Sequence, residues 1–389
     1  MGNVPHLRFP EFTEEWKETK LGKIAEITKG SGISKDRLSE YGSPCILYGE
    51  LYTKYKSEII NEVYSRTELD SSLLVKSKAN DVIIPCSGET AIDISTARCV
   101  PFNNILLGGD LNIIRLKNND GGFFAYQLNG TRKKDIARVA QGVSVVHLYG
   151  ENLKHIRVYH PAIEEQKKIT RLLSLIDKRI ATQNKIIYKL KSLIRGIMVE
   201  LQKRGLSNGT WKKVLLSNVL TERNELNKSL YPVYSVSVIQ GIVNQMEYLG
   251  RSFAASDTSK YHVVHYGDLV YTKSPTGSFP YGIIKQSYNQ NEVAVSPLYG
   301  VYEPKTFSTG VFLHEYFKSE LNTLNYLHPL VQKGAKNTIN IANQRFLESY
   351  VAIPSNANEL LAISKLLCSL NTKRHYKIFC VNGKYGIQV

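Results

Sequence analysis

The chain has no stretch of about 18 consecutive apolar residues, the length that a membrane-spanning helix needs. The segment Met1–Glu15 also lacks the apolar core of a signal peptide. Five cysteines are present, but they are scattered, odd in number and never spaced as Cys-x-x-Cys; they are Cys45, Cys86, Cys99, Cys368 and Cys380. These absences predict reduced thiols in a cytoplasmic protein, with no structural zinc site and no membrane contact.

Motifs that would indicate an active site are missing as well. The pair Gly30-x-Gly32 follows an expected strand, but the third glycine and the acidic residue of a dinucleotide site are absent. No Gly-x-x-x-x-Gly-Lys-Ser/Thr loop occurs, and no Asn/Asp-Pro-Pro-aromatic segment of an amino-methylating DNA methyltransferase. The nine histidines show no metal-ligand spacing. The sequence therefore predicts a chain without catalytic residues, metal or cofactor of its own.

Acidic residues are scarce relative to basic ones, at 34 against 50, which gives a net charge of +16 over 389 residues. The excess is concentrated in residues 161–206, with 11 basic and 4 acidic residues, and in residues 354–389, with 5 and 1. These two segments carry 11 of the 16 excess charges (7 plus 4), so the rest of the chain is nearly neutral. A polyanion, and nucleic acid first among polyanions, is the expected partner.

The chain contains a divergent repeat with a period of roughly 190 residues, too long for a solenoid. Matching segments are Trp16 and Trp211, Leu21-Gly22 and Leu216-Ser217, Asp81–Ile84 and Asp268–Tyr271, Gln141-Gly142 and Lys333-Gly334, Val158–Pro161 and Val351–Pro354, and Ile169–Leu173 and Ile363–Leu367. The strand-like and helix-like patterns between them predict an α+β protein of two duplicated α/β domains, each followed by a helix. The expected boundaries are 1–160 and 207–353 for the domains and 161–206 and 354–389 for the helical segments.

The first helical segment has an uninterrupted heptad pattern from Ile169 to Leu201, in which nine of ten positions are aliphatic. The exception, Gln183, either fixes the helix register or is a tolerated polar residue. The helix is expected to run from about Ile163 to Lys203, which makes it roughly 60 Å long at about 1.5 Å per residue. The expected seam residues are Ile169, Leu173, Ile176, Ile180, Ile187, Leu190 and Ile194 in the first helix, and Ile363, Leu367 and Leu370 in the second.

The second helix is expected to be short. Its next seam positions are Arg374 and Lys377, and Asn382-Gly383 follows as a helix breaker, so the helix is predicted to end near Arg374.

Polar loops rich in small residues recur in both repeats. Glycine allows backbone to approach a phosphate, lysine neutralises it, and polar side chains read base edges in the grooves of DNA. The candidate DNA-binding residues are Lys29, Ser31, Lys35, Tyr48, Glu50, Tyr52, Ser87, Glu89, Thr90, Gln141, Ser144 and His147 in the first repeat, and Tyr234, Ser235, Ser237, Lys273, Ser274, Thr276, Lys333, Lys336 and Asn337 in the second. Each loop alone is a weak signal, because most such loops are only turns.

Taken together, these segments resemble the specificity subunits of type I restriction–modification systems. The resemblance is carried by Arg8-Phe9-Pro10, by Trp16 with Leu21-Gly22, and by the run from Gln141-Gly142 through Pro161 into Glu164-Glu165-Gln166. The second repeat departs from the pattern, with Glu359-Leu360-Leu361 in place of the Glu-Gln phrase.

The resemblance implies two target recognition domains that each read one half of a bipartite double-stranded DNA target, with the helices packed antiparallel as a spacer. It also implies two partner methyltransferase subunits, which bind S-adenosylmethionine, and restriction (motor-nuclease) subunits, which use ATP and Mg. Two other interpretations stay open: a structural coiled-coil adaptor without sequence-specific DNA binding, and a DNA-modifying enzyme with an unrecognised active site.

Overall fold

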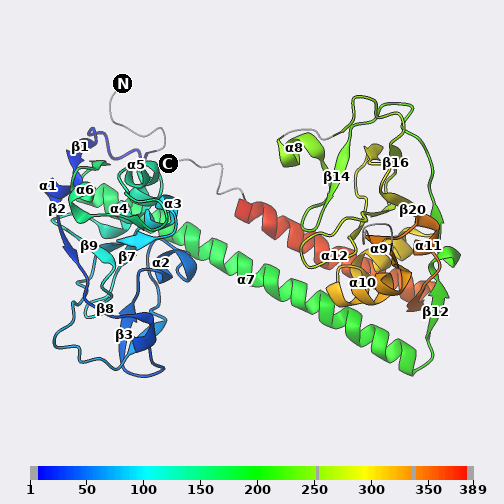
Figure 1. Cartoon of the computed structure of the whole chain (residues 1–389), viewed down its shortest axis with the longest axis horizontal. Coiled ribbons are helices and arrows are strands. Elements are labelled where there is room, and N and C mark those ends of the chain that lie inside the picture. The colour runs from blue at the N-terminus through cyan, green and yellow to red at the C-terminus, as the bar shows by residue number, and fades with distance from the viewer. Residues whose placement is uncertain (1–7, 251–253, 334–338, 383–389) are drawn as a thin grey trace. The chain divides into compact units, whose positions relative to one another are not determined.

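The computed structural model describes residues 8–250, 254–333 and 339–382. These residues form two compact units, and the boundary between the units along the chain falls between Gln183 and Asn184. Both residues lie in one long helix, α7 (Ile163–Ser207) (Figure 1). Each unit mixes strands and helices, so the predicted α+β class with duplicated domains is confirmed. The strands of the first domain end at His160, and those of the second run from Trp211 to Pro354. We call residues 8–160 the first module and residues 211–354 the second module.

The first module is built around a four-stranded sheet of order β2-β9-β5-β7, with a smaller sheet β4-β3-β8 and the ribbons β1-β11 and β10-β6. Its elements are β1 (Lys17–Lys20), α1 (Leu21–Ile24), β2 (Ala25–Lys29), η1 (Lys35–Arg37), β3 (Ser43–Ile46), α2 (Glu50–Thr53), β4 (Ser65–Thr67), β5 (Asp81–Pro85), β6 (Ser87–Gly88), α3 (Ala91–Ile94), β7 (Arg98–Val100), β8 (Leu106–Leu107), β9 (Leu111–Leu116), α4 (Gly121–Asn129), α5 (Lys133–Arg138), β10 (Val146–His147), α6 (Gly150–Lys154) and β11 (Arg157–His160).

The second module repeats this plan with a four-stranded sheet of order β13-β20-β17-β18 and the ribbon β12-β23. Its elements are β12 (Trp211–Leu215), η2 (Leu216–Asn218), β13 (Leu220–Glu222), β14 (Tyr234–Ser237), β15 (Gly241–Asn244), α8 (Gln245–Leu249), β16 (His262–Val264), β17 (Leu269–Tyr271), β18 (Ile284–Gln286), β19 (Val293–Val295), β20 (Gly300–Pro304), α9 (Phe307–Tyr316), α10 (Glu320–Leu327), η3 (His328–Leu330), β21 (Gln332–Lys333), β22 (Ile339–Asn340), α11 (Asn343–Phe346) and β23 (Tyr350–Pro354).

The two sheets match strand for strand, with β5 equivalent to β17 and β9 equivalent to β20. In each module a tryptophan at or just before the first strand of the ribbon, β1 or β12, is hydrogen-bonded to the helix that follows the module. Trp16 Nε1 donates to Glu165 at 3.3 Å, and Trp211 Nε1 donates to Glu359 at 2.7 Å. Each indole also meets a phenylalanine edge-on, with ring centroids 5.5 Å apart in both cases. Glu359 therefore takes the place of Glu165, although the glutamine that follows in the first repeat is a leucine in the second.

A buried aspartate lies at the start of the matching strand in each sheet: Asp81 is the first residue of β5, and Asp268 directly precedes β17. Asp81 accepts the backbone N–H of Lys78 at 2.7 Å and both arms of Arg115 at 2.8 and 2.9 Å. Asp268 likewise accepts the backbone N–H of His265 at 2.9 Å.

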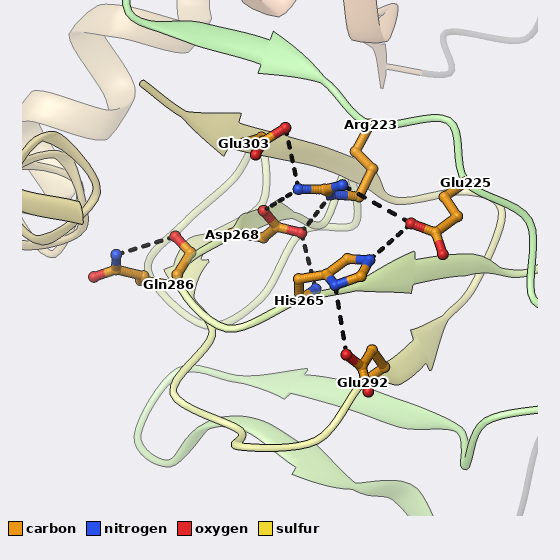
Figure 2. Close-up of polar contacts among 8 residues, drawn as sticks. Arg223, Glu225, His265, Asp268, Gln286, Glu292 and Glu303 are labelled. Atoms are coloured by element: carbon orange, nitrogen blue, oxygen red, sulfur yellow. Dashed lines mark hydrogen bonds and ion pairs between the residues drawn. The ribbon is translucent and has the colours of Figure 1, made fainter. Parts of the chain in front are cut away.

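The arginine that binds the second aspartate comes from a different strand position (Figure 2). Arg223, which follows β13, donates to Asp268 at 2.8 and 3.3 Å. When the paired strands of the two sheets are aligned, Arg223 occupies the position that Thr28 of β2 has in the first module. Glu303 in β20 occupies the place of Arg115, and it lies 3.1 Å from Arg223. The two modules thus keep the same ion pair while exchanging which strand supplies the cation.

The second half of α7 and the helix α12 (Ala357–Asn382) share the core of the second unit. Ile194 and Met198 from α7 lie in one apolar cluster with Leu360, Ile363 and Leu367 from α12, and α12 runs back along α7 (Figure 1). All seven seam residues expected in the first helix are buried or half-buried, and Leu370 packs against the same cluster.

The prediction that the second helix ends near Arg374 is wrong, because α12 continues to Asn382. Arg374 and Lys377 interrupt the apolar seam, but lysine and arginine are good helix formers and do not end a helix. At 26 residues against 45, α12 is still shorter than α7.

Candidate nucleic-acid interface

Three of the loops predicted for the first module come together where β5 ends. The short strand β6 after β5 pairs with β10, so that Gly88 faces Val146 and Ser87 faces His147. Gln141 and His147 exchange backbone hydrogen bonds at 2.8 and 2.7 Å and close a hairpin, which we call the first-module hairpin (residues 141–147). The sequence separates these two loops by more than fifty residues, and the β6–β10 pairing brings them to one place.

The third loop, around Tyr48–Tyr52, lies against the same place. A Cβ atom built on Gly88 would stand 3.6 Å from the hydroxyl of Tyr52, and one on Gly49 would stand 3.7 Å from it. Burial, with the neighbouring charges of Tyr48, Asp93 and Glu89 adding to it, raises the pKa of Tyr52, so the phenol remains a neutral donor. A hydroxyl that can donate and accept suits contacts to phosphate or base edges.

The outward face of this cluster is the part that DNA could contact. Glu89, Thr90, Gln141, Ser144 and His147 are all exposed. The hairpin tip also exposes apolar surface, since Val143 is 95% exposed.

Tyr149 was missed by the sequence analysis. Its ring stacks on His147, with centroids 6.2 Å apart, and it is 46% exposed. The alternation of His147 and Tyr149 around the buried Leu148 is the signal that could have identified it, because alternate residues of an extended segment share a face.

Several predicted residues have structural roles instead. Glu50 is 6% exposed, and its carboxylate accepts hydrogen bonds from Leu47 N–H, Lys54 and Ser65. Ser87 is buried beside Asp110, and Ser31 accepts the backbone N–H of Val75 at 2.7 Å. These contacts inside the module favour a structural role for the three residues over direct contact with a base.

Thr90 caps α3 and is exposed, so it keeps one side toward solvent. Lys29 is exposed at the end of β2. Burial raises the pKa of the Cys86 thiol, next to β6, and the charge of Lys29 opposes that shift. Lys35 is exposed in η1, and no contact in the described part of the chain links it to the three loops.

Gly30 lies so close to Gly108 that a Cβ atom on Gly30 would stand 2.0 Å from the carbonyl oxygen of Gly108. This close approach accounts for the glycine at position 30, so no cofactor is needed to explain it.

In the second module the loop after β17 contains Lys273, Ser274 and Thr276, at the place that matches residues 87–90. Thr276 and Phe279 exchange two backbone hydrogen bonds of 3.0 Å, which folds the loop into a tight turn. Ser274 is exposed, and Thr276 is half-buried. Burial lowers the pKa of Lys273, while the charge of Glu222 opposes that shift.

The prediction that Tyr234–Ser237 forms a loop is wrong, because these residues are strand β14, paired with β15. Ser237 is buried, and its hydroxyl oxygen accepts the N–H groups of Ile239 and Gln240. Tyr234 and Ser235 are half-buried, and Ser235 accepts from Gln245 at 3.1 Å. The exposed tip of this hairpin is Ile239 and Gln240 instead.

The last predicted loop can be placed only in part. Lys333 lies in β21, opposite Ile339 in β22, so its backbone forms a hairpin like that of Gln141. Lys336 and Asn337 lie outside the described residues.

Among the residues that the structure describes, no three histidine, cysteine or carboxylate side chains gather as a metal site. The helices within the described ranges include none that is long and apolar enough to cross a membrane.

Comparison with known proteins supports the same family. A family model of the type I restriction modification DNA specificity domain matches residues 13–192. The MjaVIII specificity subunit of a type I restriction enzyme from Methanocaldococcus jannaschii is 24% identical over 204 residues, 51% of this chain and 44% of that protein. The putative MjaX specificity subunit of the same organism is 25% identical over 217 residues, 52% of this chain and 49% of that protein. The matched region thus spans about half the length of these curated relatives.

Over the whole chain the similarity is one of fold. The crystal structure of a type I restriction–modification S subunit from M. genitalium superposes with a TM-score of 0.66 at 14% identity, covering 100% of this chain and 96% of that one. Residues 13–192 therefore belong to the type I restriction–modification DNA specificity domain family, and the chain as a whole has the fold of a type I S subunit.

Proposed function

We propose that this chain is the DNA-specificity subunit of a type I restriction–modification enzyme. The observation that carries the proposal is that polar loops follow the same end of the matching strand, β5 or β17, in two duplicated modules. In the first module, β6 and the first-module hairpin meet after β5, and in the second the Lys273–Thr276 loop follows β17. Polar loops at matching places in two duplicated modules suit a target with two half-sites.

In this proposal the chain itself catalyses nothing and acts in the cytoplasm. It binds double-stranded DNA and serves as a scaffold for two methyltransferase subunits, and through them for the motor-nuclease subunits. S-adenosylmethionine, ATP and Mg belong to those partners. The shared core of α7 and α12 supports the scaffold role, because it joins the long helix to the second module by side-chain packing.

Salt-dependent DNA binding tests this proposal. The purified chain, with its methyltransferase subunit, should bind a cognate duplex more tightly than a scrambled duplex, and the affinity should fall steeply with salt because phosphate contacts release counterions. A structural adaptor would bind its protein partner and show no difference between duplexes. Binding of S-adenosylmethionine by the isolated chain would instead support a DNA-modifying enzyme and would contradict the noncatalytic role.

A further inference from the structure

Three aromatic rings gather on the surface of the second module beside an acidic network. We propose that this site docks a lysine- or arginine-bearing segment of a protein partner. The rings are Tyr266, Tyr288 and Phe307, which we call the aromatic patch. Its location is the beginning of β17, whereas the Lys273–Thr276 loop proposed to contact DNA follows the end of that strand. The inference goes beyond the proposed DNA-reading role and does not depend on it.

The rings contact one another and still face solvent. Tyr266 and Phe307 stack with centroids 5.3 Å apart and planes 3° apart, and Tyr288 stands edge-on 6.4 Å from each. They remain 49%, 40% and 44% exposed in the order Tyr266, Phe307, Tyr288. They also come from three separate segments, which are the turn before β17, the start of α9 and the residues after β18. A clustered aromatic surface of this kind is typical of a recognition site.

The turn that carries Tyr266 is held in place. Asp268 N–H donates to His265 O at 3.2 Å, and Gly267 between them has a φ of +93°, as a tight turn of this type requires. Gln286 fixes the turn from the other side by donating to the carbonyl of Gly267 at 3.0 Å. A Cβ on Gly267 would meet the ring of Phe307 at 3.4 Å. The patch is therefore preorganised before any partner arrives.

The first module has the same turn without the rings. Asp81 N–H donates to Lys78 O at 3.0 Å, and Asn80 has a φ of +81° in the place of Gly267. By turn position, strand register and helix start, the counterparts of Tyr266, Tyr288 and Phe307 are Ala79, Pro101 and Gly121. The fold does not need aromatic residues at these three positions, since the duplicate does without them, so their presence together points to binding.

The same turn that carries Tyr266 also carries His265 and Asp268, which belong to an acidic network shown in Figure 2, and the charges of this network select the kind of partner. Arg223 and His265 are surrounded by four carboxylates, those of Asp268, Glu225, Glu303 and Glu292. The four carboxylates of this network outnumber its one arginine. The side chains of Glu225, Glu292 and Glu303 are 45%, 44% and 58% exposed.

An acidic surface in a chain of net charge +16 repels a phosphate backbone and attracts cations. Aromatic rings bind lysine and arginine through cation–π contacts, and the carboxylates supply hydrogen-bond acceptors. A basic protein segment satisfies both features of the site, whereas DNA satisfies only the stacking surface.

The experiment measures binding of a fluorescent octaarginine peptide to the full chain by anisotropy, with a random DNA duplex as the second probe. The wild type should bind the peptide, and Tyr266→Ala, Phe307→Ala and Glu292→Gln should each weaken that binding about tenfold. Matched variants in the first module, Tyr41→Ala and Glu62→Gln, change an exposed ring and an exposed carboxylate outside the patch and should leave binding unchanged.

Circular dichroism confirms that each variant is folded. Absence of peptide binding by the wild type would overturn the proposal, and so would equal binding by the patch and control variants. Loss of duplex binding in Tyr266→Ala or Phe307→Ala, with peptide binding unaffected, would assign the patch to DNA instead.

Discussion

At the residue scale, the two modules share an aspartate–arginine ion pair, although the arginine comes from a different strand in each module. Asp81 and Asp268 hold matched places, but the cation comes from Arg115 in β9 in the first module and from Arg223 after β13 in the second. The sequence repeat identified the aspartates, because Asp81–Ile84 aligns with Asp268–Tyr271. It could not identify their partners, because the arginines are not aligned with each other.

This exchange can be tested by building the second arrangement in the first module. Arg115→Glu alone should destabilise the first module by about 3 kcal/mol, because it removes the partner of a buried carboxylate and adds a like charge. Adding Thr28→Arg, the counterpart of Arg223, should recover most of that loss. Amide hydrogen exchange in β5 and β9 measures the effect, with β17 as an internal control. A double variant no more stable than Arg115→Glu would contradict the equivalence.

A second residue-scale feature is the pair of carboxyl groups of Glu58, in the first module, and Asp177, in α7. Asp177 in α7 accepts the hydroxyl of Tyr126 at 2.6 Å. Burial, and then the charge of Asp177, raise the pKa of Glu58 above 4.5, although the charge of Arg98 opposes the shift. Because the folded state holds this proton more tightly than the unfolded state, Glu58 lowers stability progressively as pH rises above 4.5.

Glu58→Gln should therefore raise the melting temperature more at pH 8 than at pH 5, because the amide mimics the protonated carboxyl at every pH. Thermal unfolding at the two pH values measures the difference. The variant Glu62→Gln, at an exposed glutamate of the same module, is measured alongside as the control for removing one carboxylate. A melting temperature raised equally at both pH values would count against a shifted pKa at Glu58.

At the element scale, periodicity was a good guide to the helices and a poor guide to the loops. The heptad pattern placed α7 within a few residues of its limits, because an apolar stripe is a local property of the sequence. The nature of Tyr234–Ser237 was misjudged, because short polar strands pair through their backbones and leave little trace in side-chain pattern. The gathering of β6 with the first-module hairpin is a long-range contact that no local signal reveals.

The seam of α12 allows a matched test with neighbouring leucines. Leu367 is fully buried in the cluster shared with α7, whereas Leu366 is 44% exposed. Leu367→Ala should destabilise the second unit by about 3 kcal/mol. Leu366→Ala should change stability by about 0.5 kcal/mol or less. Hydrogen exchange in α9 and β17 reports both, and similar losses for the two variants would contradict the assigned helix face.

At the scale of the whole molecule, the proposed function depends on the duplication of one module. Each module has the same sheet order, a tryptophan hydrogen-bonded to the helix that follows and the same buried aspartate, while the residues at the loop ends differ. Shared elements preserve the framework, and in the proposed function the divergent loops would allow the two modules to select different sequences.

A map of methylated adenines tests the central claim most directly. The chain is expressed with its methyltransferase subunit in a host that lacks DNA methylation, once as the wild type and once with the first-module hairpin replaced by an unrelated hairpin. The account predicts a bipartite motif with a fixed gap, of which the exchange alters or abolishes only one half-site. A contiguous motif in the wild type, or a change in both half-sites after the exchange, would contradict two independent reading modules.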